Sequence, residues 1–230
     1  MARPPRGSGA RAPAPARRTQ VRPRGLGGLN GVDAAALTVA RSAEPILAWR
    51  AWALTVHGDD LALEPVAGRG KAWPARKVMR SRCRHAGLHT SPNPGCSCGL
   101  HGTHGLEILR KTRTPAVLGR VALWGRVIEH ELGFRAALGY PQRLRLVCQF
   151  CFQVWGAEHA HPAVVGLFPR GDLVPLCWTH VELAQRYGMT PRRLFRATQI
   201  EQRLLDTYAV ELLPIPTGRI PAPPMLAGRR

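Results

Sequence analysis

The chain has 230 residues and a mass of 25.2 kDa, and 33 Lys and Arg residues against 14 Asp and Glu residues give a net charge of +19. All but three of the basic residues are arginine, whose forked guanidinium suits bidentate contacts with phosphate. No apolar run approaches the ~20 residues that cross a bilayer, and no continuous apolar segment follows the basic N-terminus as in a signal peptide. We therefore expect a cytoplasmic protein without a membrane segment, associated with the nucleoid if it binds DNA.

Residues 1–45 are rich in Arg, Pro, Ala and Gly, and their only acids are Asp33 and Glu44. Such a composition predicts a disordered basic tail, which either follows a nucleic-acid backbone or is simply solvated. Because this segment holds eight of the 33 basic and two of the 14 acidic residues, the remainder keeps 25 against 12, a charge of +13. The charge therefore belongs to the folded body as well.

Alternating apolar residues from Ile46 to Val56 predict a strand, and a turn at 57–60 leads into a second strand over 61–66 that pairs back. The β-branched, glycine-punctuated segment 117–128 and the alternating segment 134–147 predict two more strands. Residues 46–147 are therefore expected to form a small antiparallel sheet or barrel.

Between these strands, residues 69–84 place seven basic residues in sixteen positions without an acid. They are Arg69, Lys71, Arg76, Lys77, Arg80, Arg82 and Arg84. The run indicates either a surface that binds phosphates or an ordinary solvated face. Trp73 within it would stack on a base or anchor the segment in the core.

The first Cys/His cluster has the pattern Cys83-x5-His89-x6-Cys96-x-Cys98, with His85, His101 and His104 as spare imidazoles. Zinc takes four nitrogen or sulfur ligands in a tetrahedron, and a loop rich in Gly and Pro can wrap around one ion. Because the loop has too few apolar residues to hold itself together, we expect a metal to do so. The alternative is a mobile loop with reduced cysteines.

The second cluster is Cys148-x2-Cys151 followed, after 25 residues, by Cys177-x2-His180. The first pair follows a predicted strand as in a zinc knuckle, and the second pair opens a predicted helix, which is the order of a treble-clef finger. With ligand-like spacing and no secretion signal, metal binding is favoured over disulfides. The cofactors predicted for the chain are thus two structural zinc ions, and buried free thiols are the alternative at this cluster.

Between the two ligand pairs lie Glu158-His159-Ala160-His161-Pro162 and Gly171-Asp172-Leu173. Residues 148–185 resemble the HNH nuclease finger. The resemblance implies that His159 is a general base and Glu158 a ligand of a catalytic divalent ion. Asp172 stands where the family has Asn, and Val181 where a His or Asn completes the metal site. These departures favour a finger without catalysis.

Near the C-terminus, residues 175–187 predict a helix that Gly188 ends, and Thr190 with Pro191 predicts the start of a second helix reaching Tyr208. The spacing resembles a helix-turn-helix, which would place the second helix in a major groove. Its exposed side would then carry the nucleic-acid contacts Arg192, Arg193 and Arg196. The alternative is a helical hairpin that only covers the zinc finger, and residues 213–230 are expected to be a Pro-rich tail.

Residues 49–145 resemble a group of small, mostly uncharacterised bacterial proteins that is frequent in actinomycetes. The residues that carry the resemblance are Trp49, Trp52, Trp73, Cys83, His89, Pro92, Cys96 to Gly99, Gly119, Val121, Trp124 to Glu129 and Gly133 to Ala136. The resemblance implies that His89 rather than His85 is the ligand, and it implies no activity.

Together these patterns predict an α+β protein with a β domain over 46–147 and a treble clef with a helical hairpin over 148–212. We expect a non-catalytic regulatory or mobile-element protein whose partner is nucleic acid, in the first place double-stranded DNA, and which has no small-molecule substrate; the sequence does not distinguish DNA from RNA. An HNH-like endonuclease and a zinc-built protein-interaction module are the alternatives.

Overall fold

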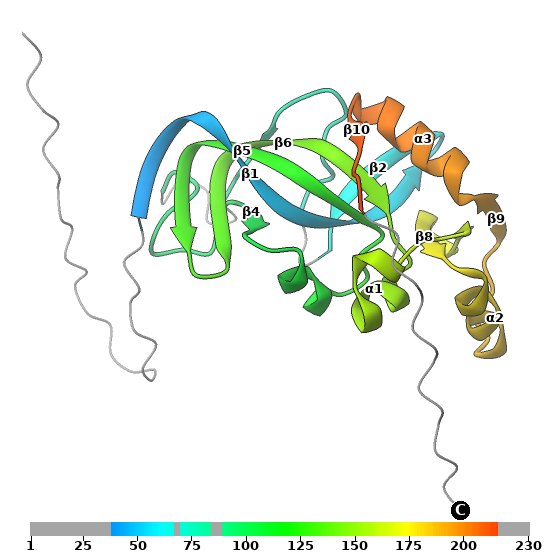
Figure 1. Ribbon diagram of the computed structural model, residues 1–230. Helices are drawn as coiled ribbons and strands as arrows, with labels where there is room; N and C mark the ends of the chain where they lie inside the picture. The colour runs from blue at the N-terminus through cyan, green and yellow to red at the C-terminus, as the bar shows by residue number, and fades with distance from the viewer. Residues whose placement is uncertain (1–37, 67–69, 84–88, 216–230) are drawn as a thin grey trace, which may run out of the picture. The chain divides into compact units, whose positions relative to one another are not determined.

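The computed structural model describes residues 38–66, 70–83 and 89–215, and a mostly antiparallel 10-stranded sheet dominates them (Figure 1). The strands are β1 (Thr38–His57), β2 (Asp60–Pro65), β3 (Met79–Arg80), β4 (Leu100–Thr103), β5 (Val117–His130), β6 (Gly133–Leu146), β7 (Val164–Leu167), β8 (Asp172–Leu176), β9 (Arg193–Arg196) and β10 (Glu211–Leu212). The helices are α1 (Gln149–Trp155), α2 (Trp178–Arg186) and α3 (Ala197–Tyr208), with short 3-10 turns η1 (Glu107–Lys111), η2 (Ala157–His159) and η3 (Pro169–Gly171). No helix in this part of the chain is long and apolar enough to span a bilayer.

Residues 48–55 of the long strand β1 and 117–123 of β5 place buried side chains on both faces of the sheet. Consecutive side chains of a strand point to opposite faces, and here they enter two different hydrophobic cores. Trp52 and Val117 belong to the first core, which α3 covers, whereas Ala51 and Leu118 belong to the second core, to which α1 and α2 contribute. The sheet therefore separates two apolar layers.

Four strands close a ring, since β1 pairs with β5, β5 with β6, β6 with β4, and β4 with β1. Glycine permits the close approaches: a Cβ at Gly102 would lie 2.5 Å from the Cβ of Ala48, and one at Gly119 would lie 2.3 Å from the carbonyl oxygen of Arg143. No larger residue fits these positions without moving a strand. The predicted small antiparallel sheet or barrel is confirmed, and so are the strands at 61–66, 117–128 and 134–147.

Both predicted tails are shorter than expected. β1 begins at Thr38 because its pairing with β5 continues to the register Thr38↔Glu129. At the other end, Leu213 and Ile215 are buried in the second core. The tail predictions are therefore wrong for 38–45 and for 213–215, while their remaining residues lie outside the described part of the chain.

The helix predicted from Pro191 is wrong for its first third, residues 191–196, because residues 193–196 form the edge strand β9. This segment pairs antiparallel with β7, and the N–H of Arg192 donates to the carbonyl of Leu167 at 2.7 Å. The backbone groups of residues 193–196 form their hydrogen bonds with the open edge of β7, whereas in a helix they would bond within the segment itself. A strand thus separates α2 from α3, and the predicted helix-turn-helix is not formed.

The boundary predicted at residue 148 is crossed by the sheet and by the first core, and the described residues belong to one compact unit. β8 pairs with β1 at Leu54 and Thr55. The hydroxyl of Tyr208 in α3 donates to the carbonyl of Trp73 at 2.8 Å and accepts from the N–H of Leu63 at 2.9 Å. Trp73 is 3% exposed, so it anchors its segment in the core and is not available to stack on a base.

Candidate metal centres

The second cluster brings Cys148, Cys151, Cys177 and His180 together, with every ligand atom within 4.8 Å of the others. The Sγ atoms of Cys151 and Cys177 are 3.7 Å apart, and Nδ1 of His180 lies 3.5 Å from the sulfurs of Cys148 and Cys151. A tetrahedral zinc ion with ordinary bond lengths separates two sulfurs by about 3.8 Å and a sulfur from a nitrogen by about 3.6 Å. The four ligand atoms therefore fit a single zinc-sized cation.

Regular elements hold the second cluster in place. Cys148 lies two residues after the end of β6, and Cys151 lies on the buried side of α1. Cys177 is the N-cap residue of α2 and His180 lies in its first turn, where the His180 N–H donates to the Cys177 carbonyl at 3.0 Å. The ring of Phe150 stacks on His180 with centroids 4.9 Å apart. The β7–β8 hairpin lies between the two ligand pairs in the chain.

The first cluster brings Cys83, His89, Cys96 and Cys98 together within the same 4.8 Å limit. The sulfurs of Cys83 and Cys96 are 3.7 Å apart, and Nε2 of His89 is 3.3 Å from the sulfur of Cys98. Each of the four residues is partly exposed, and the loop contains no strand or helix between Ser81 and Gly99 in its described residues. The prediction that these four residues meet is confirmed.

Arg135 on β6 supports this loop, and it was not among the predicted site residues. Its guanidinium is buried and its Nη1 donates to the carbonyls of Asn93, Cys96 and Cys98. Gly99 lets the chain turn beside it, because φ is +133° there and a Cβ would lie 3.0 Å from the Cβ of Arg135. The only signal in the sequence was that Arg135 stands among the residues of the actinomycete resemblance.

Two of the spare imidazoles are engaged elsewhere. Nε2 of His101 lies 3.0 Å from the Ser97 carbonyl oxygen, and Nε2 of His104 lies 3.2 Å from the His130 carbonyl oxygen. His85 lies outside the described residues. The histidine that joins the cluster is His89, as the resemblance implied.

The thiols of the second cluster do not all ionise together. A hydrogen bond from the Cys148 thiol lowers the pKa of Cys177 to about 4, and the same bond raises the pKa of Cys148 above its ordinary range. Burial raises the pKa of Cys151 to about 11. One thiolate is thus stable among three crowded sulfurs, whereas a divalent cation would deprotonate its thiol ligands. The chemistry of the donor set therefore fits a cation at the centre.

In the first cluster, burial acts to raise the pKa of Cys98, but hydrogen bonds from Ser91 and His89 outweigh it and lower that pKa to about 6. Cys98 is therefore a thiolate near neutral pH, which is the form that binds metal.

The residues of the HNH resemblance are not members of either cluster. Glu158 and His159 are in η2, and Asp172 begins β8. In the described ranges, the two Cys/His clusters are the only groups of three or more His, Cys, Asp or Glu that meet as metal ligands. The structure does not bring Glu158, His159 or Asp172 into a third such group.

The predicted nucleic-acid residues occupy two places at opposite ends of α3. Lys71, Arg76, Lys77, Arg80 and Arg82 are exposed, and Nη2 of Arg76 donates to the carbonyl of Asp206 near the C-terminal end of α3 at 2.8 Å. Arg192, Arg193 and Arg196 are exposed on and before β9, which leads into α3. Arg69 and Arg84 lie outside the described residues.

Comparisons with models of protein families, with curated proteins and with solved structures found no match to this chain. The resemblances to the actinomycete group and to the HNH finger therefore stay predictions. The evidence for the two metal centres is therefore geometric: each of two sets of Cys and His residues brings its ligand atoms close enough together to hold a metal ion.

Proposed function

We propose that each cluster holds one structural zinc ion and that the protein built on them binds nucleic acid through arginine. Three cysteines and one histidine form a common ligand set for structural zinc. Four protein ligands complete the coordination of zinc and leave no position for water or substrate, so such a site stabilises structure and does not catalyse.

The second cluster supports the treble-clef interpretation in its element order. The first ligand pair precedes the β7–β8 hairpin, and the second pair opens α2. The first pair stands at the start of α1 rather than in a turn between two strands, so we interpret this finger as a variant of the treble clef.

Nucleic-acid binding rests on one observation, the excess of exposed arginines without acidic partners. In the part of the chain that the structure describes, only Arg110 and Arg143 form ion pairs with a carboxylate. Positive charge that is not neutralised within the protein attracts a polyanion and releases its counterions on binding. Near β9, the exposed aromatic residues Trp178 and Tyr187 lie in the same stretch of sequence as Arg192 and Arg193, which suits contacts with bases as well as phosphates.

The edge strand β9 changes the expected mode of binding. Double-stranded DNA was predicted because a helix starting near Pro191 would enter a major groove, and that helix start is a strand. We therefore propose contacts with the phosphate backbone, which fix position on the nucleic acid without reading its sequence.

Two measurements test the proposed function. Metal analysis of protein purified without a chelating tag is expected to give two zinc ions per chain, and a value of zero would contradict it. The triple variant Arg192→Gln, Arg193→Gln, Arg196→Gln is expected to weaken binding to DNA and to lower the dependence of the affinity on salt by about 0.7 to 0.9 log units per lost phosphate contact. The matched control replaces the same three residues by Lys, which keeps the charge, and unchanged binding by the Gln variant would contradict a role for this strand.

A further inference from the structure

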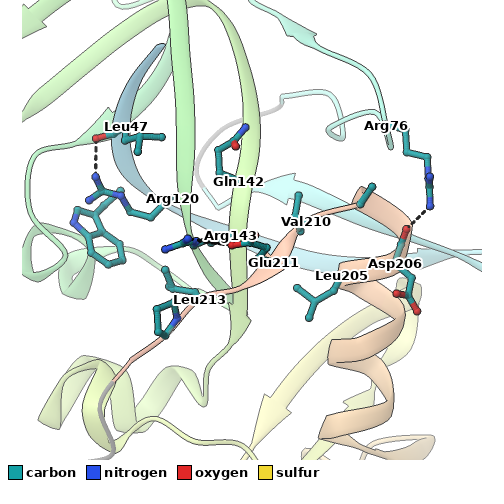
Figure 2. Close-up of a pocket in the computed structure, with 13 residues that line it drawn as sticks. Leu47, Arg76, Arg120, Gln142, Arg143, Leu205, Asp206, Val210, Glu211 and Leu213 are labelled. Atoms are coloured by element: carbon teal, nitrogen blue, oxygen red, sulfur yellow. Dashed lines mark hydrogen bonds and ion pairs between the residues drawn. The ribbon is translucent and has the colours of Figure 1, made fainter. Parts of the chain in front are cut away.

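A groove of about 1090 Å³ runs between the sheet and the segment that joins α3 to β10 (Figure 2). Three guanidinium groups from different parts of the chain line it. Figure 2 shows Arg120 at one end and Arg76 at the other, with Arg143 and Glu211 between them. Only Arg76 belongs to the basic run that the sequence singled out.

Arg120 on β5 carries a positive charge with no acidic partner among the described residues. Its guanidinium lies 4.7 Å from the ring centroid of Trp49, and its Nη2 donates to the carbonyl of Leu47 at 3.0 Å. No carboxylate of the described residues lies within ion-pair distance of it. Burial lowers the pKa of Arg120, which shows that water does not fully solvate the charge. An anion bound in the groove would offset this cost.

The two carboxylates of the groove are already engaged. Oε2 of Glu211 accepts from Nε and Nη2 of Arg143 at 3.0 Å. The side chain of Asp206 accepts from Nε2 of Gln202 at 3.0 Å, while its carbonyl accepts from Arg76. Both ends of the groove thus present guanidinium groups that retain free donors, and these donors suit phosphate oxygens.

The size and layout of the groove indicate an extended ligand. Its volume is at or above the upper end of the ~300–1,000 Å³ of small-molecule pockets, and its cations are spread along its length. A single strand can place successive phosphates along such a groove with its bases free to stack, whereas the bases of a duplex are paired and stacked within the double helix. The plane of Arg120 over Trp49 also offers a surface on which a base can stack.

We propose that this groove binds single-stranded nucleic acid, with phosphates at Arg76, Arg120 and Arg143; the inference rests on the proposed nucleic-acid-binding function and names its ligand class. Arg143 is shared between Glu211 and the ligand. Removal of the Glu211 carboxylate should therefore strengthen binding.

The test measures fluorescence anisotropy of a labelled oligo(dT) of about 12 nucleotides and of a duplex of the same length, over a series of salt concentrations. The full chain is expected to bind the single strand more tightly than the duplex. The double variant Arg76→Gln, Arg120→Gln is expected to bind the single strand about tenfold or more weakly, with a salt slope lower by about 1.4, since each phosphate contact on a single strand contributes about 0.7.

The matched control is Arg113→Gln, Arg186→Gln, which removes the same charge from exposed positions outside the groove and should change the affinity by less than about threefold. Glu211→Gln removes the negative charge of an exposed side chain and should tighten binding, a result that misfolding would not produce.

Each other outcome has a definite meaning. If the groove variant and the control bind alike, or if Glu211→Gln does not tighten binding, the groove assignment is overturned while the proposed function stands. A preference for the duplex also overturns the groove. Absence of binding to either oligonucleotide at low salt overturns the proposed function and this inference together.

Discussion

The two metal clusters have the same ligand set and similar geometry, but the protein holds them in different ways. Cys148 and Cys151 are buried in the second core, and their cluster joins a strand, α1 and α2. All four residues of the first cluster are partly exposed, and they come from an irregular loop that is tied to β6 chiefly through Arg135. A metal ion bound at the second cluster would thus be part of the core, whereas one bound at the first cluster would hold a surface loop in place.

This difference implies unequal consequences when a ligand is lost. Removing a ligand of the second cluster leaves buried polar sulfur and imidazole atoms inside a core that α1, α2 and the sheet share. Removing a ligand of the first cluster releases a loop that contributes few buried residues. The predictions below test this contrast, beginning with the largest effect.

Cys151→Ser is expected to be the most damaging change. Structural zinc contributes about 10–16 kcal/mol to the folding of small zinc domains, which is comparable with the whole stability of a typical domain. We expect loss of one zinc ion together with loss of the cooperative thermal transition, measured by metal analysis and circular dichroism. A variant that loses zinc and still unfolds cooperatively near the wild-type temperature would refute the core role of this cluster.

Cys98→Ser is the matched change in the first cluster. We expect it also to lose one zinc ion but to keep the cooperative transition, with a midpoint lower by less than about 10 °C, because the core strands keep their contacts. Hydrogen exchange should increase in residues 89–99 and stay unchanged in β1 and β5. Global unfolding of this variant would remove the contrast between the two clusters.

Arg135→Gln tests whether the hydrogen bonds from Arg135 hold the loop of the first cluster in place. The substitution leaves the carbonyls of Asn93 and Cys98 without their charged donor, and loss of such outer contacts typically lowers metal affinity about 10–100-fold. Competition with a chelator should show this weakening for one zinc ion per chain, with the other unaffected. Arg113→Gln, the same change at an exposed residue that contributes no cluster ligand, serves as the control, and equal affinities for the two variants would show that Arg135 plays no part.

Glu201→Gln is expected to have the smallest effect, and its sign depends on pH. Oε1 of Glu201 accepts from the N–H of Leu146, two residues before Cys148, at 2.8 Å, and burial raises the pKa of this carboxyl. Because the folded state favours the protonated carboxyl, the stabilisation of the fold by Glu201 is complete below the pKa of about 4.3 that a Glu has in the unfolded chain. This stabilisation is lost as the pH rises through the pKa of Glu201 in the folded protein. The variant should therefore gain stability relative to wild type as the pH is raised from about 4 toward neutral.

Denaturant unfolding of both proteins across this pH range checks the prediction, and the exposed Glu182→Gln should show no such trend. If the difference in the free energy of unfolding between Glu201→Gln and wild type is the same at both ends of the range, ionisation of the buried Glu201 carboxyl does not affect stability.

Much of the fold and of the metal centres could be predicted because the relevant signals are local. The short spacing keeps Cys177 and His180 close together, here as N-cap and first-turn residues of α2, and the single intervening residue limits how far Cys96 and Cys98 can separate. Alternation in β2, β5 and β6 likewise follows from the period of a strand. The eight ligands and these strands were therefore accessible from the sequence alone.

Other features depended on partners distant in the chain. Residues 193–196 became a strand because the edge of β7 was open to them, and Thr38 to Pro45 joined the sheet because β5 extends far enough to pair with β1. Local propensity carries no information about such an edge, so the recognition helix and the tail boundary were predicted wrongly.

By itself, then, the sequence determined which side chains can bind metal and which segments alternate, because both are set within a few residues. Only the tertiary structure decided that Trp73 is buried, that Arg135 holds the Cys96 to Cys98 loop, and that Arg76, Arg120 and Arg143 line one groove. These residues are brought together by strand pairing and by packing of the sheet against α3. Burial and hydrogen bonding between segments distant in the chain stabilise this arrangement, and no local sequence pattern encodes it.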